Sequence, residues 1–185
     1  MELNHAIQKR RSVRKFSKKK PDWRTIIECI DSMRYAPMAG NNYTLSFILV
    51  NEEEKINKIA EAAEQQFIGD AKFVLVVCSN STRPKNAYGE SGENFSRQQA
   101  GAAIENFLLS IEDEGLATCW VGYFNEEKIK TDLRIPEKWN IEAIFPIGYE
   151  QEKPRTRRLK IDLDKVLYFN RFGNKHMRKE EKRVY

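Results

Sequence analysis

The sequence has few of the residue types that bind metals or form covalent crosslinks. Its 185 residues include three cysteines and two histidines. The cysteines are far apart, form no CxxC pair and are odd in number, which argues against a complete disulfide framework and favours reduced, buried thiols in the cytoplasm. No HExxH motif or Cys/His cluster is present, so a zinc site is not expected.

Long apolar runs and a strong excess of one charge are also missing. The longest candidate apolar run, Phe73–Cys78, is far too short to cross a bilayer, and the first residues do not have the pattern of a signal peptide. The 32 Lys and Arg residues are nearly balanced by 27 Asp and Glu residues, so the net charge of +5 does not indicate a dedicated polyanion binder. These features predict a cytoplasmic protein without a membrane or nucleic-acid partner.

Helical and strand patterns alternate along the chain, which predicts an α+β or α/β sheet flanked by helices. Phe73–Cys78 has the continuous apolar character of a central strand covered on both faces. Residues 97–115 form the strongest helical pattern, and the polar segment Ser79–Ser96 is predicted to be a long loop of the kind that often forms a lid. Further helices are expected over residues 2–10, 52–66 and 125–133, and strands over 46–50 and 141–149.

A helix is also predicted after Asp22, which is a plausible N-cap, through about Tyr35. Its apolar residues recur at helical spacing, so we expect them to form one core-facing side. These residues are Trp23, Ile26, Ile27, Ile30 and Met33.

Five cations surround one small hydroxyl in the basic stretch, Lys9–Phe16. Arginine offers a planar fork of donors and Ser12 adds a hydroxyl, a combination that suits a phosphate monoester. On charge alone, a solvated turn or a nucleic-acid patch is the more common interpretation. The Gly40-Asn41 pair is similarly ambiguous, since it fits a plain tight turn or a close approach of backbone to a ligand.

Four separated segments, taken in order, resemble the signature segments of the nitroreductase family of FMN-dependent oxidoreductases. Together they span residues 3 to about 173. They are Arg10–Arg14, the loop Ala36-Pro37-Met38-Ala39-Gly40-Asn41, the turn Glu114-Gly115-Leu116-Ala117-Thr118-Cys119-Trp120-Val121-Gly122 that follows the long helix, and Pro146-Ile147-Gly148-Tyr149 followed by a basic loop.

The resemblance implies a nitroreductase-like fold, with a central, mostly antiparallel sheet flanked by helices and the long helix at a dimer interface. The domain would cover residues 1–173, followed by a basic tail over 174–185. The resemblance also implies a homodimer with two FMN sites at its interface. Its activity would transfer hydride from NADH or NADPH through FMN to an organic acceptor such as a nitroaromatic or a quinone.

The resemblance assigns cofactor contacts to residues at several places along the chain, and no catalytic side chain is required because the cofactor carries the chemistry. The phosphate and ribityl contacts would be Arg10, Arg11 and Ser12, and Arg14 would approach the N1–O2 edge of the ring. The ring contacts from the other subunit would be Pro37, Met38, Ala39 and Asn41. The remaining contacts would be Gln65 at the pyrimidine edge, the amides of Val121 and Gly122 near N5, and Arg157 and Arg158 at the phosphate, with Arg155 competing for that role.

The chain departs from the family pattern where the substrate would bind. Met38 stands in place of the usual serine, and Asn42-Tyr43-Thr44-Leu45 replaces the usual continuation with Gln, Pro and Trp. The segment Ser79–Ser96 is the remaining candidate for shaping a substrate channel. Two alternatives therefore stay open: a flavoprotein of the same fold with other chemistry, such as dehalogenation, flavin fragmentation or enoate reduction, and a basic nucleic-acid-binding protein.

Overall fold

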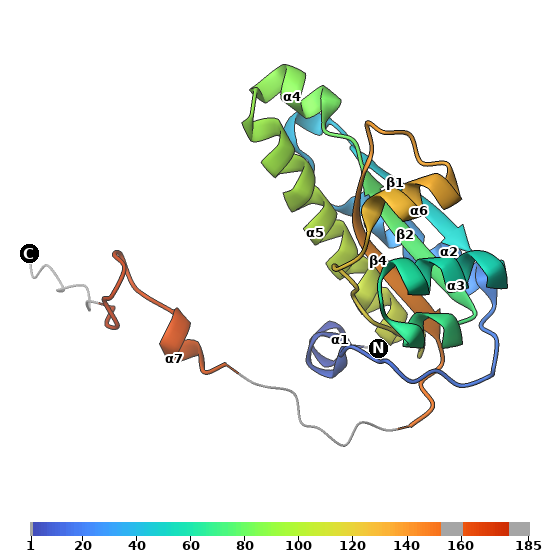
Figure 1. Cartoon of the computed structure of the whole chain (residues 1–185). Coiled ribbons are helices and arrows are strands. Elements are labelled where there is room, and N and C mark those ends of the chain that lie inside the picture. Colours follow the sequence, from blue (N-terminus) through green and yellow to red (C-terminus); the bar gives the residue numbers. More distant parts are fainter. Residues whose placement is uncertain (1, 153–160, 178–185) are drawn as a thin grey trace, which may run out of the picture. The chain divides into compact units, whose positions relative to one another are not determined.

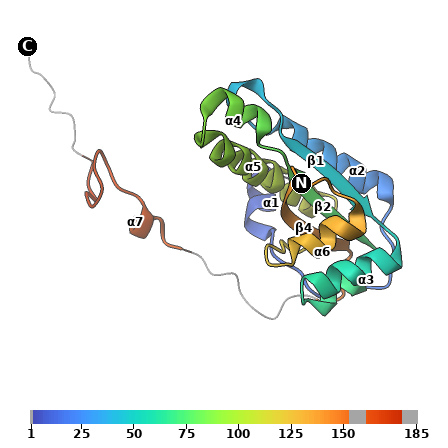
Figure 2. The same cartoon turned by 45° about the horizontal axis from the view of Figure 1, so that its top comes forward.

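A computed structural model of the chain describes residues 2–152 and 161–177. The described residues form two compact units, divided between residues 153 and 154. The first unit contains every element from α1 to β4, and the second contains the short helix α7 (Leu163–Val166) (Figures 1 and 2). The expected domain boundary at residue 173 stays a prediction.

The first unit is built on one antiparallel sheet, in the strand order β1-β2-β4-β3. The expected α+β architecture and its antiparallel sheet are therefore confirmed. The strands are β1 (Leu45–Val50), β2 (Phe73–Ser79), β3 (Ala117–Thr118) and β4 (Asn140–Gly148). The helices are α1 (Leu3–Lys9), α2 (Trp23–Asp31), α3 (Glu53–Ala62), α4 (Thr82–Tyr88), α5 (Ser91–Asp113) and α6 (Glu126–Leu133), with single 3-10 turns η1 (Ser32–Tyr35), η2 (Ala39–Asn41) and η3 (Gln66–Asp70).

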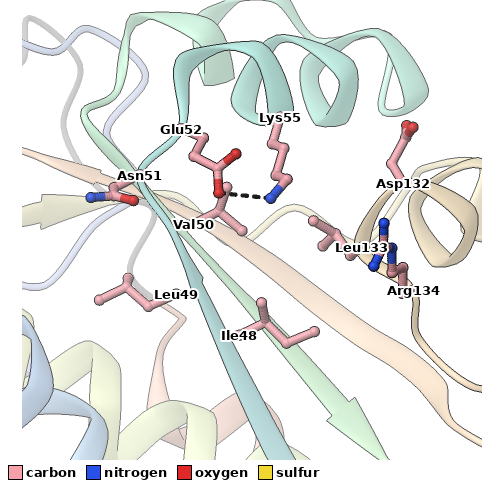
Figure 3. A pocket seen from close by; sticks show the side chains of 9 residues that line it. All are labelled: Ile48, Leu49, Val50, Asn51, Glu52, Lys55, Asp132, Leu133 and Arg134. Atoms are coloured by element: carbon pink, nitrogen blue, oxygen red, sulfur yellow. Dashed lines mark hydrogen bonds and ion pairs between the residues drawn. The ribbon is translucent and has the colours of Figure 1, made fainter.

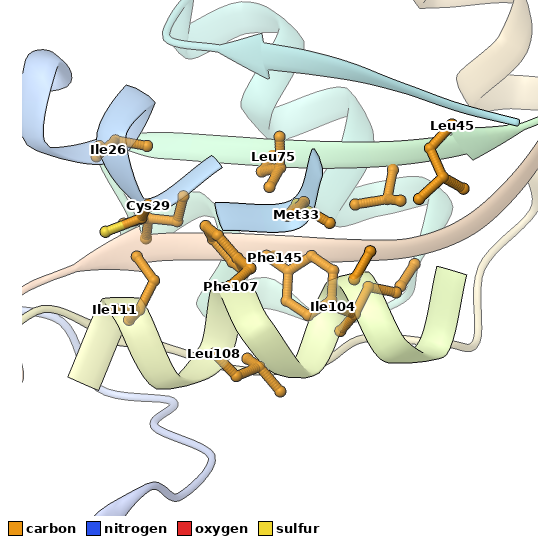
Figure 4. Close-up of a cluster of buried hydrophobic side chains, with 14 of the residues drawn as sticks. Ile26, Cys29, Met33, Leu45, Leu75, Ile104, Phe107, Leu108, Ile111 and Phe145 are labelled. Carbon is orange, nitrogen blue, oxygen red and sulfur yellow. The ribbon is translucent and has the colours of Figure 1, made fainter. Parts of the chain in front are cut away.

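Strand β2 is buried on both faces, as its continuous apolar sequence predicts. Its alternate residues point to opposite sides of the sheet. Phe73, Leu75 and Val77 belong to the core under α2 and α5, whereas Val74, Val76 and Cys78 belong to the core under α3 and α6. The long helix α5 supplies the largest part of the first core. Figure 4 shows Ile104 and Phe107 on the side of α5 that faces Phe145, whereas Leu108 points away from Phe145.

The N-cap of α2 is confirmed, because the Asp22 carboxylate accepts a hydrogen bond from the backbone N–H of Arg24 at 2.9 Å. The expected core face is only partly correct. Ile26 and Met33 are fully buried, but Trp23 and Ile27 are 51% and 45% exposed. Trp23 and Ile27 are four residues apart and share one flank of α2, beside the buried side that contains Ile26, so the apolar residues cover more of the helix than the core does. The regular helix ends at Asp31 and continues as the 3-10 turn η1, where Met33 is still buried.

The predicted loop Ser79–Ser96 is wrong, since this segment forms α4 and the first turns of α5. The residues that suggested a loop mark the ends of helices instead. Asn80 accepts a hydrogen bond from the N–H of Thr82 at 3.0 Å at the start of α4, and Gly89, with φ +60°, ends it. Pro84 lies in the first turn of α4, where its missing N–H costs nothing.

In the second unit, the described residues 161–177 include a turn that is held by the side chain of Asn174. The side-chain amide of Asn174 donates to the carbonyls of Phe169, at 2.8 Å, and His176, at 3.0 Å. Apolar side chains here are largely exposed, including Leu163 at 65% and Phe172 at 89%. In the part of the chain that is described, no helix is both long enough and apolar enough to cross a membrane.

Candidate functional site

Three of the segments singled out in the sequence lie side by side at the end of the sheet formed by β3 and β4. The backbone N–H of Val13, in the basic stretch, donates to the carbonyl of Thr118 at 2.9 Å. Further along, Ser17 donates to Tyr149 at 2.8 Å, and Gln151 donates to Lys15 at 3.0 Å. These bonds hold the basic stretch between β3 and the residues that follow β4.

A small apolar core holds the basic stretch against the end of the sheet. Val13, Phe16 and Ala117 are buried together, with the partly buried Phe67 from η3 packed against them. A β-carbon on Gly148 would lie 2.9 Å from Cδ1 of Phe16, so the ring rests directly on the glycine backbone. Val13 and Phe16 are buried, whereas Ser12, Arg14 and Lys15 between and beside them stay exposed.

Most of the cations in the basic stretch face a carboxylate. Two pairs reach α5: Lys9 with Glu112 at 3.0 Å, and Arg10 with Glu105 at 3.3 Å. Two pairs reach the segment after β4: Arg11 with Glu150, and Lys15 with Glu152 at 3.2 Å. Arg14 differs, because within residues 2–152 and 161–177 it forms no ion pair; its guanidinium carbon lies 6.0 Å from the centre of the Phe67 ring.

Arg14 and Ser12 also lie beside the buried thiol of Cys119. Burial raises the pKa of Cys119, while the positive charge of Arg14 and a hydrogen bond with Ser12 lower it by less. The thiol is therefore neutral at physiological pH and is not an activated nucleophile. The contact places the Ser12 hydroxyl and the Arg14 charge on the same side of the segment that follows β3.

The amides of Val121 and Gly122 differ in what they can offer. The N–H of Val121 donates to the carbonyl of Ile144 at 3.0 Å, in an isolated bridge to β4. It is therefore occupied. Gly122 is exposed, and its N–H has no hydrogen-bond partner among the residues described. Of the two amides expected near N5 of the flavin, only that of Gly122 is free to bind.

Gln65 lies on the rim of a hollow of about 610 Å³ between α3 and η3. The same 3-10 turn contains Phe67, which contacts the Val13 and Phe16 core and faces Arg14. The expected role of Gln65 at the pyrimidine edge stays a prediction, since the contact with the basic stretch is made by Phe67, two residues further on. Most of its lining residues are of polar types; besides Gln65 they are Asn57, Ala60, Glu61, Glu64, Gln66, Gly69 and Asp70.

The Gly40 loop, residues 37–42, is not brought to this neighbourhood within one copy of the chain. The loop contains the expected ring contacts Pro37, Met38, Ala39 and Asn41. It leads into Thr44, whose N–H and hydroxyl both donate to Gln99 in the first half of α5, at 3.0 and 2.5 Å. The basic stretch instead pairs with Glu105 and Glu112, further along the same helix.

Arg155, Arg157 and Arg158 lie outside the described residues. The described chain leading toward them ends at Glu152, whose carboxylate pairs with Lys15 of the basic stretch. Sequence reasoning did not identify Glu150 or Phe67 as part of this region. Glu150 follows Tyr149 directly, so an acid next to the Gly-Tyr motif was the available signal; Phe67 had none, because one aromatic residue after a helix has no distinctive spacing.

A second hollow lies elsewhere, beside the edge strand β1. It has a volume of about 450 Å³, and Figure 3 shows Ile48, Leu49 and the ion pair between Glu52 and Lys55 on its walls. None of the residues predicted to bind a cofactor lines it. In the described portion, no three His, Cys, Asp or Glu side chains are grouped as a metal site would require.

The donors in the basic stretch fit an anionic cofactor such as FMN. The Nε atom of Arg11 is buried and has no hydrogen-bond acceptor among the described residues, although its Nη2 is paired with Glu150. A buried donor without an acceptor is costly unless a ligand or water completes it. Arg11 Nε and the Gly122 amide are therefore donors without a partner among the described residues, and Arg14 is a cation without an ion pair there.

The fold is that of an α+β protein in which the basic stretch lies at the end of one antiparallel sheet. The family model described as the nitroreductase family matches residues 7–68 and 60–149, and the chain belongs to this family. The expectation of an oxidoreductase is confirmed at this level.

Individual relatives agree with the family assignment. A Methanothermobacter thermautotrophicus protein, provisionally named an NADH dehydrogenase/NAD(P)H nitroreductase, is 29% identical over 90% of this chain and 86% of its own length. An iodotyrosine deiodinase of Thermotoga neapolitana is 22% identical over 92% of this chain and 98% of its own. The structure of an FMN-dependent nitroreductase from Clostridium difficile superposes with a TM-score of 0.78, covering 91% of this chain and 99% of that one at 22% identity.

Proposed function

We propose that the protein binds FMN and transfers hydride from NADH or NADPH to an organic acceptor such as a nitroaromatic or a quinone. One observation carries the proposal: the basic stretch, the residues after β3 and the residues after β4 lie side by side, with Arg11 Nε buried and lacking an acceptor. Relatives named for NAD(P)H and FMN chemistry support it.

Each group of the site would have a separate task. Arg11 and Ser12 would bind the phosphate and ribityl end, with Arg10 next to them and Arg157 and Arg158 closing the clamp. Arg14 would place an uncompensated positive charge at the N1–O2 edge of the ring, and the Gly122 amide would donate near N5. When bound, FMN supplies the hydride chemistry between nicotinamide and acceptor. The chain then only has to bind, orient and bias it, which requires no side-chain acid or base.

We further propose that the active form is a homodimer. The Gly40 loop lies along the first half of α5 and the basic stretch along the second half, so one copy cannot supply both to the same ring. Two copies paired through antiparallel α5 helices would bring the loop of one to the basic stretch of the other. The half-exposed side of α5, with Gly101, Ala102 and Leu109, suits such a pairing.

A reducing compartment, the cytoplasm, fits the three thiols. Cys29, Cys78 and Cys119 are all buried and unbridged, and burial raises the pKa of each. The ion pairs of Lys9, Arg10, Arg11 and Lys15 argue against a nucleic-acid surface, because nucleic-acid binding depends on many cations that neutralise phosphates and four of the five cations in the basic stretch are already paired with carboxylates.

The absorption spectrum of the purified protein tests the proposal directly. Bound FMN gives visible flavin bands, which should bleach with NADH or NADPH under anaerobic conditions and return when a nitroaromatic or a quinone is added. The proposal is rejected if the protein neither carries flavin nor acquires it from an excess of added FMN. If the protein retains flavin but NADH and NADPH do not bleach it, the proposed electron donor is wrong, while the proposed cofactor stands.

The second candidate is a flavoprotein of the same fold with another acceptor. The relationship to an iodotyrosine deiodinase favours reductive dehalogenation as the specific alternative. The substrate side is also where this chain departs most from the family pattern, at Met38 and after Asn41. Comparing the acceptor-dependent return of flavin absorbance for nitroaromatics, quinones and halogenated phenols separates the two candidates.

A further inference from the structure

The Gly40 loop has an unusual backbone and few supports. Gly40 and Asn41 have φ values of +55° and +56°, two consecutive left-handed residues. The Asn42 side chain donates to the Gly40 carbonyl at 3.2 Å, but both Gly40 and Asn41 are exposed. A loop of this kind needs contacts from outside to hold one conformation, because the left-handed region costs free energy for Asn41.

One such contact comes from Tyr88, the last residue of α4. A β-carbon on Gly40 would overlap the Tyr88 hydroxyl oxygen and lie 3.2 Å from its Cζ atom, so the phenol rests on the glycine backbone. Phe95 of α5 holds the ring from the side, edge-on, with centroids 5.3 Å apart and an interplanar angle of 85°. Tyr88 itself remains 43% exposed.

Helix α4, which ends with Tyr88, is packed closely against α5. A β-carbon on Gly92 would overlap the backbone of Pro84, so α4 and α5 pack with their backbones in contact. Glu93 of α5 accepts from Lys85 of α4 at 2.7 Å, and this ion pair joins the two helices. Glu93 also pairs with Arg97 of its own helix at 2.8 Å. Tyr88 therefore presents its hydroxyl to the loop from a fixed position.

We propose that Tyr88 is a positioning residue for the Gly40 loop, and that through this loop it sets how the protein packs on the flavin ring. This inference rests on the proposed function, in which Ala39 and Asn41 pack on the ring. A change at Tyr88 should therefore alter the contacts with the flavin ring and leave the contacts of Arg11 and Ser12 with the phosphate unchanged.

The test compares Tyr88→Ala and Tyr88→Phe with Arg83→Ala, an exposed side chain on the same helix. Affinity is measured for FMN and for riboflavin, which lacks the phosphate. Tyr88→Ala should weaken both by the same factor, about fivefold for the loss of one ring-packing contact, and should shift the visible flavin bands. Tyr88→Phe should have a smaller effect, and Arg83→Ala none.

A second measurement tests the contact without flavin. Gly40→Ala should lower the denaturation midpoint, and combining it with Tyr88→Phe should restore part of the loss, because the removed oxygen occupies the place of the new methyl group. The inference is overturned if Tyr88→Ala matches Arg83→Ala, if only FMN and not riboflavin is weakened, or if the double variant recovers nothing. A wild-type protein that binds neither flavin would instead reject the proposed function, and the inference with it.

Discussion

At the scale of single residues, the site depends on how Arg11 divides its donors. Its Nη2 is paired with Glu150, and its Nε is buried without an acceptor among the described residues. A guanidinium has five N–H donors in a fixed plane, so it can serve a carboxylate on one edge and a phosphate on another. The Nε–H of Arg11 is thus available to a ligand even though Nη2 is paired with Glu150.

Arg11→Gln should therefore weaken FMN while changing riboflavin affinity little. Losing a charge-assisted hydrogen bond costs about 1.5–3 kcal/mol, or roughly tenfold to a hundredfold in Kd. Titration of the apoprotein with each flavin, followed by fluorescence quenching, measures the difference. Lys15→Gln is the matched control, because it removes a neighbouring cation whose carboxylate partner is exposed.

The double variant Arg11→Gln with Glu150→Gln separates two sources of that loss. In the single variant Glu150 is left as an unpaired carboxylate close to the phosphate. If this repulsion matters, the double variant should regain part of the FMN affinity. Equal loss of FMN and riboflavin in the single variant would contradict a phosphate role for Arg11.

Because of the buried thiols, we expect the free energy of unfolding to fall at alkaline pH. Burial raises the pKa of Cys78 from 9.0 to about 12. Below pH 9 both folded and unfolded chains keep the proton, but between pH 9 and 12 only the unfolded chain loses it. Stability therefore falls as pH rises through this range, by up to about 1.4 kcal/mol per pH unit for each such thiol.

Cys78→Ala should reduce this alkaline loss, although it lowers stability at pH 8 by leaving a small cavity. Urea denaturation at pH 8 and pH 10.5 gives the pH-dependent part as a difference. Val76→Ala, on the same face of β2 and equally buried, is the control, since it creates a cavity without removing a titrating group. An unchanged pH dependence in Cys78→Ala would mean that the thiol ionises in the folded state as easily as in the unfolded one.

At the scale of elements, the site is built by the seam between the basic stretch and β4. Phe16 lies on Gly148, and the two backbones are joined at Ser17–Tyr149 and Lys15–Gln151. Because residues 13–17 of the basic stretch run along this seam, the register of the pairing decides which of their side chains point outward. Gly148 of the Gly-Tyr motif is thus needed in this chain because a side chain there would collide with the Phe16 ring.

Gly148→Ala should destabilise the fold by about 1–3 kcal/mol, as expected when a methyl group is forced into a packed contact. The Phe16 ring would have to move, so FMN affinity should fall as well. Chemical denaturation and flavin titration measure both effects. Gly69→Ala is the control, because its nearest neighbour is the adaptable Asn57 side chain at 3.1 Å; a loss as large as that of Gly148→Ala would contradict the packing argument.

The same scale shows what the sequence could and could not predict. The buried strand β2, the Asp22 cap and the long helix α5 follow from local patterns, because each is written in adjacent residues. Helix α4 was missed, since Pro84 and Gly89 are loop signals until their places at the two ends of a short helix are known. The pairing of Arg11 with Glu150 could not be predicted, because it joins residues 139 positions apart through a β-seam.

At the scale of the whole molecule, the chain exposes apolar surface around α5 that one copy does not cover. A hollow of about 480 Å³ between α1, α2, η1 and α5 is lined by Leu3, Tyr35 and Leu109 together with the polar residues Glu28, Asp31, Ser32, Asn106 and Ser110. Leu3 is 65% exposed and Tyr35 is 77% exposed. Exposed apolar side chains gathered around one helix are typical of an interface between subunits.

Leu109→Glu should separate the copies and remove the flavin at the same time. A carboxylate in an apolar interface must be desolvated, which costs several kcal/mol and shifts a dimer toward monomer at micromolar concentration. If the Gly40 loop of one copy completes the site of the other, FMN affinity should fall as the monomer forms, and both should recover at high protein concentration. Light scattering coupled to flavin absorbance measures mass and occupancy in one experiment. Lys128→Gln, on the exposed side of α6, makes the same change of one charge unit and should alter neither. A monomer that keeps its FMN would contradict the shared site, because one copy would then hold the ring without the partner's loop.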